Sequence, residues 1–388
     1  MDFSLSHAQN AVVEAVGAVM NRFDDDYWLQ ADRNARFPEE FYLAIAEGGW
    51  LGIAMPEHLG GAGLGVSEAA LMMQTVADSG GGMAAASSIH INIFGPHTIV
   101  VHGTPEQQET WLPPLIAGRE RCCFGVTEPD AGLDTGAITT RAVPSGHGYR
   151  ISGRKIWTST AQRADKIMLL ARTTPVEQCS KKTDGLSLFY TDLDHKHVDV
   201  TEIEKMGRAA VDSNMVFIDD LPVPRDHLIG EEGRGFRYLL HSLNPERILL
   251  AAEACGLGRN ALNRAAKYAG EREVFGRPIG RNQAIQHPLA QSWVDLHGAE
   301  LMIRQAAWLY DQERPCGAEA NAAKYFAAEA AHTAATRAVS TLGGMGYARE
   351  YHVERLLRES MIPKLAPISA QLILCHIAET VLGLPKSY

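Results

Sequence analysis

One glutamate in this sequence has a setting in which acid–base chemistry could occur. Glu246 and Arg247 lie in the segment SLNPERILLAA. Asn244 can cap a helix and Pro245 suits its first position, so Glu246 has a purely structural interpretation as a first-turn acid that the helix dipole stabilises. The catalytic interpretation is a carboxylate at the start of an apolar helix, where burial raises the pKa and suits the group to proton abstraction. The residues alone leave both interpretations open.

Four other segments have residue types that could bind an anionic or aromatic ligand. Arg272 offers a guanidinium for phosphate, with the aromatic face of Phe275 nearby. VTEPDAG at 126–132 predicts a strand that ends in a turn, whose backbone amides could cradle a ligand. WTST at 157–160 places an aromatic face beside hydroxyls, and LGGMGY at 342–347 closes an alanine-rich helix. Each also has a structural interpretation, such as a charged helix end, a half-buried tryptophan or a helix C-cap.

Three segments of different character must position these residues. Residues 1–120 are predicted to be helical, with an amphipathic repeat over 4–22 and a further helix that Pro38 opens. Residues 121–235 contain six short alternating or apolar runs, which predict a small β-barrel or sandwich. Residues 236–388 return to long helices rich in helix formers. The order contains no βαβ alternation and no GxGxxG after a strand, which argues against a Rossmann site.

The third segment also contains an apolar stripe that predicts a buried helix face. Its members recur at helical spacing, which is typical of residues that face a core. They are Leu289, Trp293, Leu296 and Ile303.

Composition limits the class of protein. The 388 residues are 46% hydrophobic and 21% charged, which is typical of a soluble globular protein of two or three structural units and excludes a disordered or fibrous chain. The net charge of −10 argues against broad nucleic-acid or anionic-membrane binding. We expect no secretory signal and no membrane insertion, because no basic leader precedes an apolar run and no apolar stretch reaches 18 residues. The six cysteines form no CxxC pair, so we expect reduced thiols and a cytoplasmic location.

Six motifs in order resemble the acyl-CoA dehydrogenase family of flavoproteins over nearly the whole chain. They are FPEEFYLAIAEGGWLGIAMPEHLGGAGL, CCFGVTEPDAGLD, GYRISGRKIWTST, VFIDDLPVPRDHLIG, REVFGRPIGRNQAIQ and LGGMGYAREYHVERLLRES. The resemblance implies a mainly α fold with a central β-domain: a helical N-terminal domain (1–120), a β-barrel-like middle domain (121–235) and a C-terminal four-helix bundle (236–388). It also implies a homotetramer that binds FAD, converts an acyl-CoA thioester to the trans-2-enoyl-CoA and passes electrons to an electron-transfer flavoprotein.

The resemblance further implies which residues contact FAD, partly across subunits. Those that match the flavin-facing segments of the family are Phe124, Val126, Thr127, Trp157, Thr158 and Ser159. Arg272, Phe275 and Gln283 match residues that contact the FAD of a neighbouring subunit. The family's dinucleotide loop corresponds to Leu342, Gly343 and Gly344, and its last FAD-binding segment to Ser369 and Gln371.

By the same resemblance, Glu246 is the catalytic base. Most members carry a glutamate in a late Glu-Gly-Thr stretch, but this position is Pro367 here, and proline cannot abstract a proton. The isovaleryl and long-chain members also lack the late glutamate and carry the base on the helix that begins with a Glu-Arg pair. That pair is Glu246 and Arg247 here. We therefore expect Glu246 to take the α-proton, with Asn244 and Arg247 as substrate contacts.

Three departures from the family pattern keep other functions open. Pro367 has no N–H to donate to the thioester carbonyl, which motivates a flavin-dependent monooxygenase on the same fold. Leu133 and Ser340 replace a serine and a glutamine near the cofactor, which motivates a non-catalytic partner subunit of a hetero-oligomer. The acyl group is left undetermined, although the small residues within 78–95 predict room for a long or branched chain.

Overall fold

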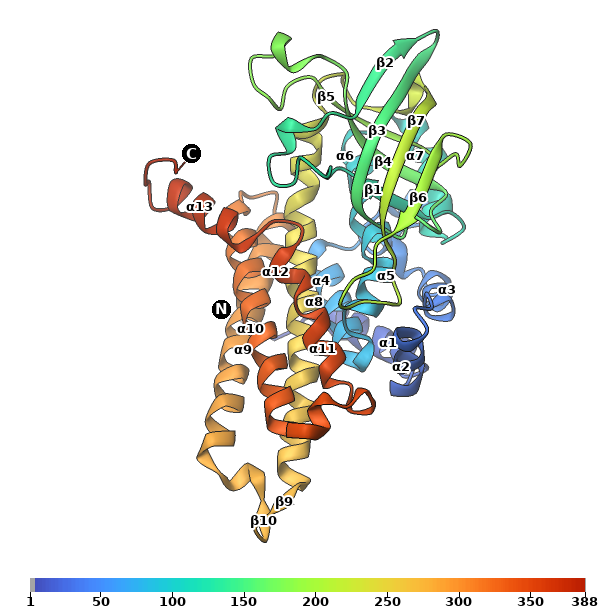
Figure 1. Cartoon of the computed structure of the whole chain (residues 1–388). Helices are drawn as coiled ribbons and strands as arrows, with labels where there is room; N and C mark the ends of the chain where they lie inside the picture. Colours follow the sequence, from blue (N-terminus) through green and yellow to red (C-terminus); the bar gives the residue numbers. More distant parts are fainter. Residues whose placement is uncertain (1–3, 388) are drawn as a thin grey trace.

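Helices at both ends of the chain flank a central β-sheet (Figure 1). The computed structural model describes residues 4–387. The predicted helix over 4–22 is α1, which begins after a capping box in which Ser6 and Gln9 satisfy each other's backbone N–H groups. The helices before the sheet are α1 (His7–Met20), α2 (Asp25–Arg33), α3 (Glu39–Glu47), α4 (Val66–Val76), α5 (Gly82–Phe94), α6 (His97–His102) and α7 (Pro105–Ile116).

The central sheet has the strand order β6-β7-β3-β2-β4-β5-β8, with β1 paired in parallel to β4. Its strands are β1 (Cys122–Gly125), β2 (Arg141–Ser145), β3 (Gly148–Ser159), β4 (Lys166–Arg172), β5 (Leu186–Asp192), β6 (Val198–Glu202), β7 (Ser213–Pro224) and β8 (Leu228–Ile229). The six predicted strands are β2 to β7, and the predicted hairpin is the antiparallel pair β2 and β3. Alternation identified β2, β3, β6 and β7, which bury one face, whereas β4 and β5 are buried on both faces and appear in the sequence as apolar runs.

Long helices follow the sheet and form a bundle. They are α8 (Gly235–Glu271), α9 (Gln283–Asp311) and α10 (Gly317–Leu342), followed by α11 (Val353–Glu359), α12 (Ile362–Leu365) and α13 (Ala370–Thr380). A small hairpin of β9 (Glu273–Val274) and β10 (Arg277–Pro278) joins α8 to α9 at the tip of the bundle (Figure 1).

A single helix, α8, connects the sheet to the bundle, so the prediction that a helix begins at Asn244 is wrong. α8 continues through Pro245, whose missing N–H removes only one intrahelical hydrogen bond. The preceding turns bury apolar surface against the sheet, since Leu239 lies in one core with Met168 of β4, and tertiary packing of this kind stabilises a helix. Glu246 therefore lies inside α8, and the helix dipole does not explain it.

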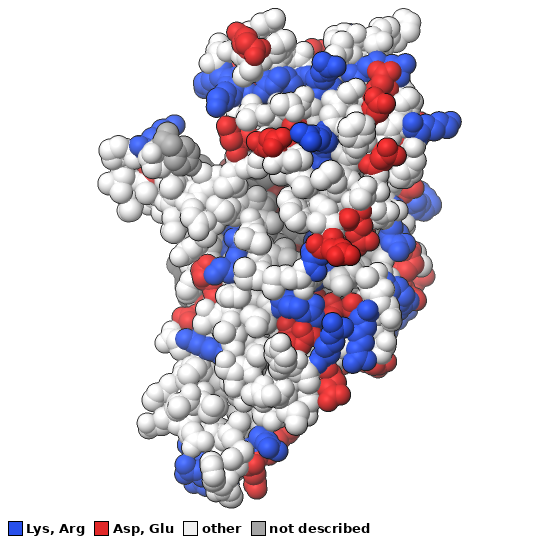
Figure 2. Space-filling view, in the orientation of Figure 1, with Lys and Arg blue, Asp and Glu red and all other residues white. Residues whose placement is uncertain are grey.

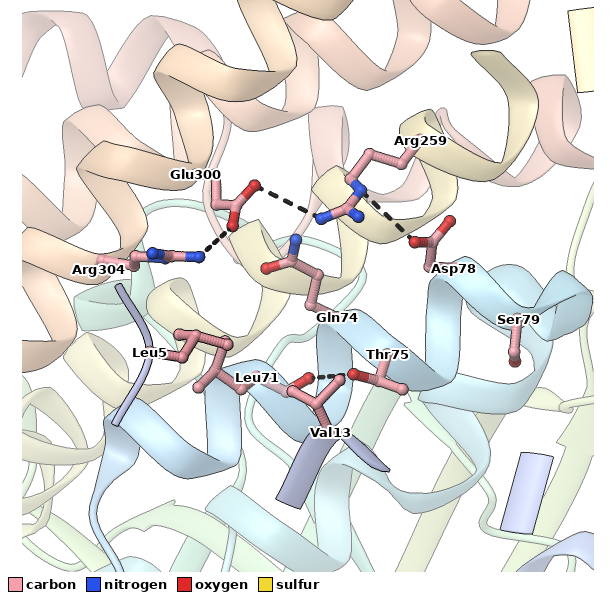
Figure 3. Close-up of a pocket in the computed structure, with 10 residues that line it drawn as sticks. All are labelled: Leu5, Val13, Leu71, Gln74, Thr75, Asp78, Ser79, Arg259, Glu300 and Arg304. Carbon is pink, nitrogen blue, oxygen red and sulfur yellow. Dashed lines mark hydrogen bonds and ion pairs between the residues drawn. The ribbon is translucent and has the colours of Figure 1, made fainter. Parts of the chain in front are cut away.

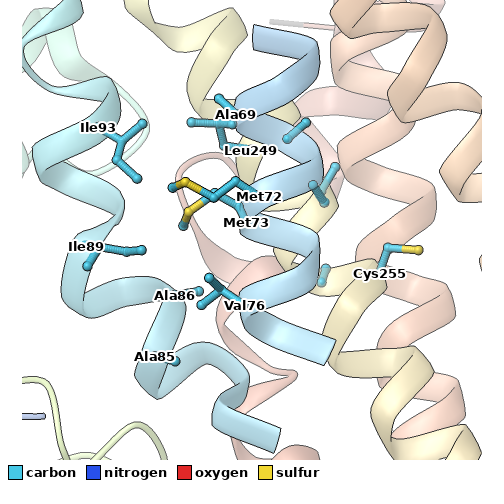
Figure 4. Packing of buried hydrophobic residues seen from close by; sticks show 14 of the residues in the cluster. Ala69, Met72, Met73, Val76, Ala85, Ala86, Ile89, Ile93, Leu249 and Cys255 are labelled. Atoms are coloured by element: carbon cyan, nitrogen blue, oxygen red, sulfur yellow. The ribbon is translucent and has the colours of Figure 1, made fainter. Parts of the chain in front are cut away.

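The main core is formed where α4, α5 and α8 meet (Figure 4). Met72 and Met73 of α4 point toward α5, Val76 of α4 lies beside Ala86 of α5, and Leu249 of α8 belongs to the same cluster. Ala85 and Ala86 are completely buried in this core, and room for an acyl chain along the small residues of 78–95 stays a prediction. Small side chains here let two helices approach closely, because protein interiors are close-packed.

The predicted core stripe on α9 is correct for Leu296 and Ile303 and wrong for Trp293. The first two are buried, whereas Trp293 is 59% exposed and stacks on His297. Helical spacing shows which residues share a face of a helix, but not whether the same chain covers all of that face.

Residues 353–380 are apolar enough on average to cross a membrane. The structure divides them among α11, α12 and α13, of which the longest has 11 residues. A helix that spans a bilayer needs about 20 residues without interruption. Much of this segment is not covered by the described chain, since Ile373 is the buried residue of α13 and Leu365 and Leu374 are exposed.

A buried carboxylate anchors the start of α5. Glu359 accepts hydrogen bonds from the backbone N–H groups of Met83, at 2.7 Å, and Ala84, at 3.2 Å. Arg355 lies 3.1 Å from the same carboxylate and donates to the carbonyl of Gly81. Both side chains are fully buried. α11 thus holds the N-terminal end of a helix that lies 276 residues earlier in the chain.

We expect replacement of Glu359 by alanine to destabilise the protein by about 3–5 kcal/mol, because it leaves Arg355 buried without its partner. The matched control is Asp134→Ala, since Asp134 pairs with Lys182 on the surface, and such pairs contribute about 1 kcal/mol or less. Thermal unfolding followed by circular dichroism measures both. Equal melting temperatures for the two variants would show that Glu359 does not anchor α5.

Candidate active site

Glu246 is the residue around which the candidate site is arranged. Its Oε2 is buried, and no described residue donates a hydrogen bond to this atom. Burial raises the pKa of the Glu246 carboxyl to about 7, against the opposing effect of nearby positive charges. A buried carboxyl without a donor keeps a high affinity for a proton, as a general base requires.

Charged groups from three helices surround this carboxyl. His90 of α5, Arg247 of α8 and Lys324 of α10 lower the pKa of Glu246, and Glu253 of α8 raises it. The effect of burial exceeds each of these contributions. The chemistry of the site therefore depends on the exclusion of water more than on any one neighbour.

The two predicted substrate contacts lie on the same helical turn as Glu246. Arg247 Nη1 donates to Asn244 Oδ1 at 3.1 Å. Arg247 Nε is buried, and no described residue accepts from it. Burial lowers the pKa of Arg247, although the adjacent Glu246 opposes this effect. A guanidinium with a free buried N–H is suited to bind a polar ligand group, and the roles of both residues stay predictions.

Lys324 connects α10 to the segment that contains Pro367. Its Nζ donates to the carbonyl of Ile368 at 2.7 Å, and burial lowers the pKa of Lys324 to about 8. Ser369 caps α13 with its hydroxyl, and Gln371 in the first turn of that helix is exposed. The late segment is thus held against the helix whose lysine also faces Glu246.

Ring contacts connect strand β1 to the surroundings of Glu246. Phe124 packs edge-on against Phe94 of α5, with their ring centroids 5.7 Å apart. Phe94 in turn lies 4.6 Å from the ring of His90. The structure therefore brings Phe124, which the resemblance assigns to the flavin-facing strand, to the same side of α5 as the charged cluster.

The other predicted flavin contacts lie on the turn after β1 and at the end of β3. The backbone carbonyls of Val126 and Thr127 accept hydrogen bonds from β3 residues, at 3.0 Å each. Trp157 is 57% exposed and has a left-handed φ of 62°. Thr158 Oγ1 is buried and has no described partner, and Ser159 Oγ accepts from a buried guanidinium at 3.1 Å. An exposed indole beside an unpaired buried hydroxyl fits a ligand with both aromatic and polar parts.

A second group of predicted contacts lies at the far end of the bundle. It consists of Arg272, Phe275 and Gln283 around the β9–β10 hairpin, and Leu342, Gly343 and Gly344 at the end of α10 (Figure 1). Arg272 follows Glu246 by 26 residues (272 − 246), and at the rise of an α-helix this is about 39 Å. Phe275 is fully exposed, and a side chain at Gly343 would meet no atom within 4 Å. Within one chain, the predicted FAD contacts therefore form two groups, one near Glu246 and one at the far end of the bundle.

Three residues of the charged cluster were missed by the sequence analysis. Glu253 follows Glu246 by seven residues, which puts both on one face of α8, and an acid inside the apolar run ILLAAEACG was the available signal. His90 similarly interrupts the apolar run MAAASSIHINIF. Nothing in the sequence around Lys324 distinguishes it from a solvated helix lysine.

A cavity of about 450 Å³ lies elsewhere, beside α4, α8 and α9 (Figure 3). Its charged groups pair with one another: Arg259 lies 3.4 Å from both Asp78 and Glu300, and Glu300 lies 2.5 Å from Arg304. The residues that line it are Leu5, Val13, Leu71, Gln74, Thr75, Asp78, Ser79, Arg259, Glu300 and Arg304. These include none of the site residues described above, so the cavity is separate from the candidate site.

Comparison with known proteins gives matches over the whole chain. Three family models match: the N-terminal domain of acyl-CoA dehydrogenase at residues 6–119, its middle domain at 123–221 and its C-terminal domain at 233–367. The chain is 36% identical to acyl-CoA dehydrogenase FadE12 of Mycobacterium bovis, covering 100% of this chain and 99% of that one. It is 34% identical to the caffeyl-CoA reductase-Etf complex subunit CarC of Acetobacterium woodii, covering 86% and 87%. The structure of butyryl-CoA dehydrogenase from Megasphaera elsdenii superposes with a TM-score of 0.94 at 27% identity, covering 98% and 100%.

We expect Glu246→Gln to stabilise the protein more at pH 8 than at pH 5. In the unfolded chain the carboxyl loses its proton near its ordinary pKa of 4.5, whereas in the folded protein it keeps the proton up to about pH 7. Between these values the folded state binds more protons, so the stability of the wild type falls as pH rises. The difference amounts to roughly 3 kcal/mol above pH 7. Melting temperatures of both proteins at the two pH values measure it, and a pH-independent difference would contradict the raised pKa.

Proposed function

The chain belongs to the acyl-CoA dehydrogenase family and is an oxidoreductase, and from this premise we propose that it converts an acyl-CoA thioester to the trans-2-enoyl-CoA with Glu246 as the base. The observation that carries the proposal is the carboxyl of Glu246: its Oε2 is buried and receives no hydrogen bond from a described residue, and burial raises its pKa to about 7. A base with this pKa is half deprotonated near neutral pH, where it can both accept and release a proton. The same group would have no evident purpose in a non-catalytic subunit.

In the proposed reaction, Glu246 takes the α-proton of the thioester onto a carboxylate oxygen. Exclusion of water keeps this carboxylate reactive, because no solvent shell must be removed. The free Nε–H of Arg247 is available to a polar part of the substrate. Since Pro367 has no N–H, we propose the backbone amide of Ile368 as the donor to the thioester carbonyl. Lys324 holds this residue through its carbonyl.

FAD is the cofactor of this enzyme, and when bound it accepts the β-hydrogen as a hydride. Several features of the chain fit an aromatic group with a diphosphate tail. Trp157 presents an exposed ring beside the unpaired hydroxyl of Thr158, and these would hold the aromatic part. Arg272 and Phe275 offer a guanidinium and a free ring at the bundle tip, and Gly343 offers open backbone, which would hold the nucleotide part.

We propose that the enzyme is a homotetramer in which the two groups of FAD contacts come from different subunits. Their separation along α8 supports this arrangement, because a single chain holds them at opposite ends of the bundle. An exposed apolar stripe on α9, with Val294, Leu301 and Trp308 seven residues apart, also supports burial by another subunit. Figure 2 shows that the surface of the lower helical bundle carries few charged side chains above its tip.

We further propose an electron-transfer flavoprotein as the electron acceptor. The similar chain from Acetobacterium woodii is named as a subunit of a reductase-Etf complex, which supports the proposal. That relative is named as a reductase, so the assay must run in both directions.

We expect Glu246→Gln to lose reduction of bound FAD by acyl-CoA, by about 1,000-fold or more, while FAD stays bound. Glutamine keeps the size of the side chain but cannot accept the α-proton, and positioned acid–base groups contribute about 100- to 10,000-fold. Anaerobic visible absorbance during titration with short, branched, medium and long acyl-CoAs measures the loss, and Glu300→Gln serves as the control outside the site. Full reduction in Glu246→Gln would sink the proposal. A wild type that no thioester reduces, but that consumes oxygen once its flavin is reduced, would favour the monooxygenase.

We expect Arg272→Ala to weaken FAD binding by about 10- to 100-fold, the value of a charge-assisted hydrogen bond. The control is Lys267→Ala, which removes an exposed cation from the same end of α8. Flavin fluorescence released on dilution measures retention in both variants. Equal retention in the two would show that Arg272 does not hold the cofactor.

A further inference from the structure

A buried acid and histidine form a hydrogen-bonded pair beside the base. His90 Nδ1 contacts Glu253 Oε1, and the side chains are about nine-tenths and completely buried. Burial alone would lower the pKa of His90, but the adjacent carboxylate raises it above the ordinary value. The other carboxylate oxygen, Glu253 Oε2, is buried and has no described partner.

The acid of this pair lies on the same helix as the proposed base. Glu253 is on the same face of α8 as Glu246, two turns further along, about 10.5 Å by helical rise. His90 contacts Glu253 directly, and the charges of both acids raise the pKa of His90, whereas Arg208 lowers it. Its ring also contacts Phe94, which packs on Phe124 of β1. The pair is therefore bounded by α5, α8 and the proposed flavin-facing strand.

Packing alone does not account for this pair. Ala252, Ala254 and Cys255 on either side of Glu253 are completely buried and apolar. Desolvation makes a buried ion pair in such surroundings less stable than apolar residues of similar size. An acceptor oxygen left without a donor adds a further cost. The unpaired Glu253 oxygen therefore calls for a hydrogen-bond donor from outside the described chain.

Building on the proposed function, we propose that Glu253 and His90 select an acyl chain that carries a hydroxyl group. The hydroxyl donates to Glu253 Oε2, which satisfies the carboxylate, while His90 holds the other oxygen. An unsubstituted hydrocarbon chain at the same place would leave that oxygen unpaired. Sites of this kind discriminate strongly, because the penalty falls on the substrate that lacks the hydrogen-bonding group. The substrate class is thus a hydroxyacyl-CoA whose hydroxyl lies beyond the β-carbon.

The test compares paired substrates on the FAD-loaded wild-type enzyme. We expect kcat/KM for 6-hydroxyhexanoyl-CoA or 8-hydroxyoctanoyl-CoA to exceed that for hexanoyl-CoA or octanoyl-CoA by about 10-fold or more. In the double variant His90→Leu/Glu253→Leu, both polar partners are removed together, which leaves no unpaired charge. We expect this variant to prefer the unsubstituted chains. Glu300→Gln, outside the site, is expected to keep the wild-type preference.

Each outcome distinguishes this proposal from the proposed function. Equal use of both series by the wild type would overturn the hydroxyl preference while leaving the dehydrogenase function intact. An unchanged preference in a folded, FAD-loaded double variant would assign the selection to other residues. Failure of every thioester in both series to reduce the flavin would overturn the proposed function and this inference with it.

Discussion

The cost of burying charge inside an apolar helix is the constraint on which the rest of this structure depends. α8 carries Glu246, whose Oε2 is buried, and Glu253, which is completely buried, so each acid must find a partner or keep a proton. Glu253 has His90 as a partner, and one of its oxygens stays unpaired. Glu246 Oε2 receives no hydrogen bond from the described part of the chain, and burial raises the pKa of this carboxyl to about 7. Two identical side chains on one helix face thereby acquire different chemical properties.

Buried polar contacts between distant segments keep this arrangement in place. Glu359 of α11 holds the start of α5, the helix that carries His90. Lys324 holds the late segment through the carbonyl of Ile368. Within the sheet, Lys155 of β3 lies 2.9 Å from Glu128. Burial of Glu128 raises the pKa of its carboxyl, but Lys155 and backbone donors outweigh this effect and lower the pKa to about 2. Such contacts are sensitive to the loss of either partner, so the site depends on groups that touch no substrate.

The division of the predicted cofactor contacts follows from the length of α8. A straight helix of 37 residues spans the molecule and connects the sheet to the bundle tip, so residues at its two ends cannot meet in one chain. The exposed Phe275 and the uncovered stripe on α9 are apolar surfaces that a folded monomer leaves to water. A shared cofactor and a subunit interface, as proposed, would cover both surfaces, which makes assembly part of the chemistry of the enzyme.

The sequence by itself determined the features that depend on near neighbours in the chain. Alternating and apolar runs located β2 to β7, an amphipathic repeat located α1, and ordered motifs indicated the family and singled out Glu246. Tertiary structure decided the burial, the partners and the pKa of those residues. The continuation of α8 through Pro245 depends on Leu239 packing against the sheet. Trp293 is exposed because no other segment of the described chain covers that part of α9. The pairing of His90 with Glu253, 163 residues apart, and the raised pKa of Glu246 depend on which segments exclude water from them. Desolvation is a property of the packed molecule, so no local pattern of residues contains it.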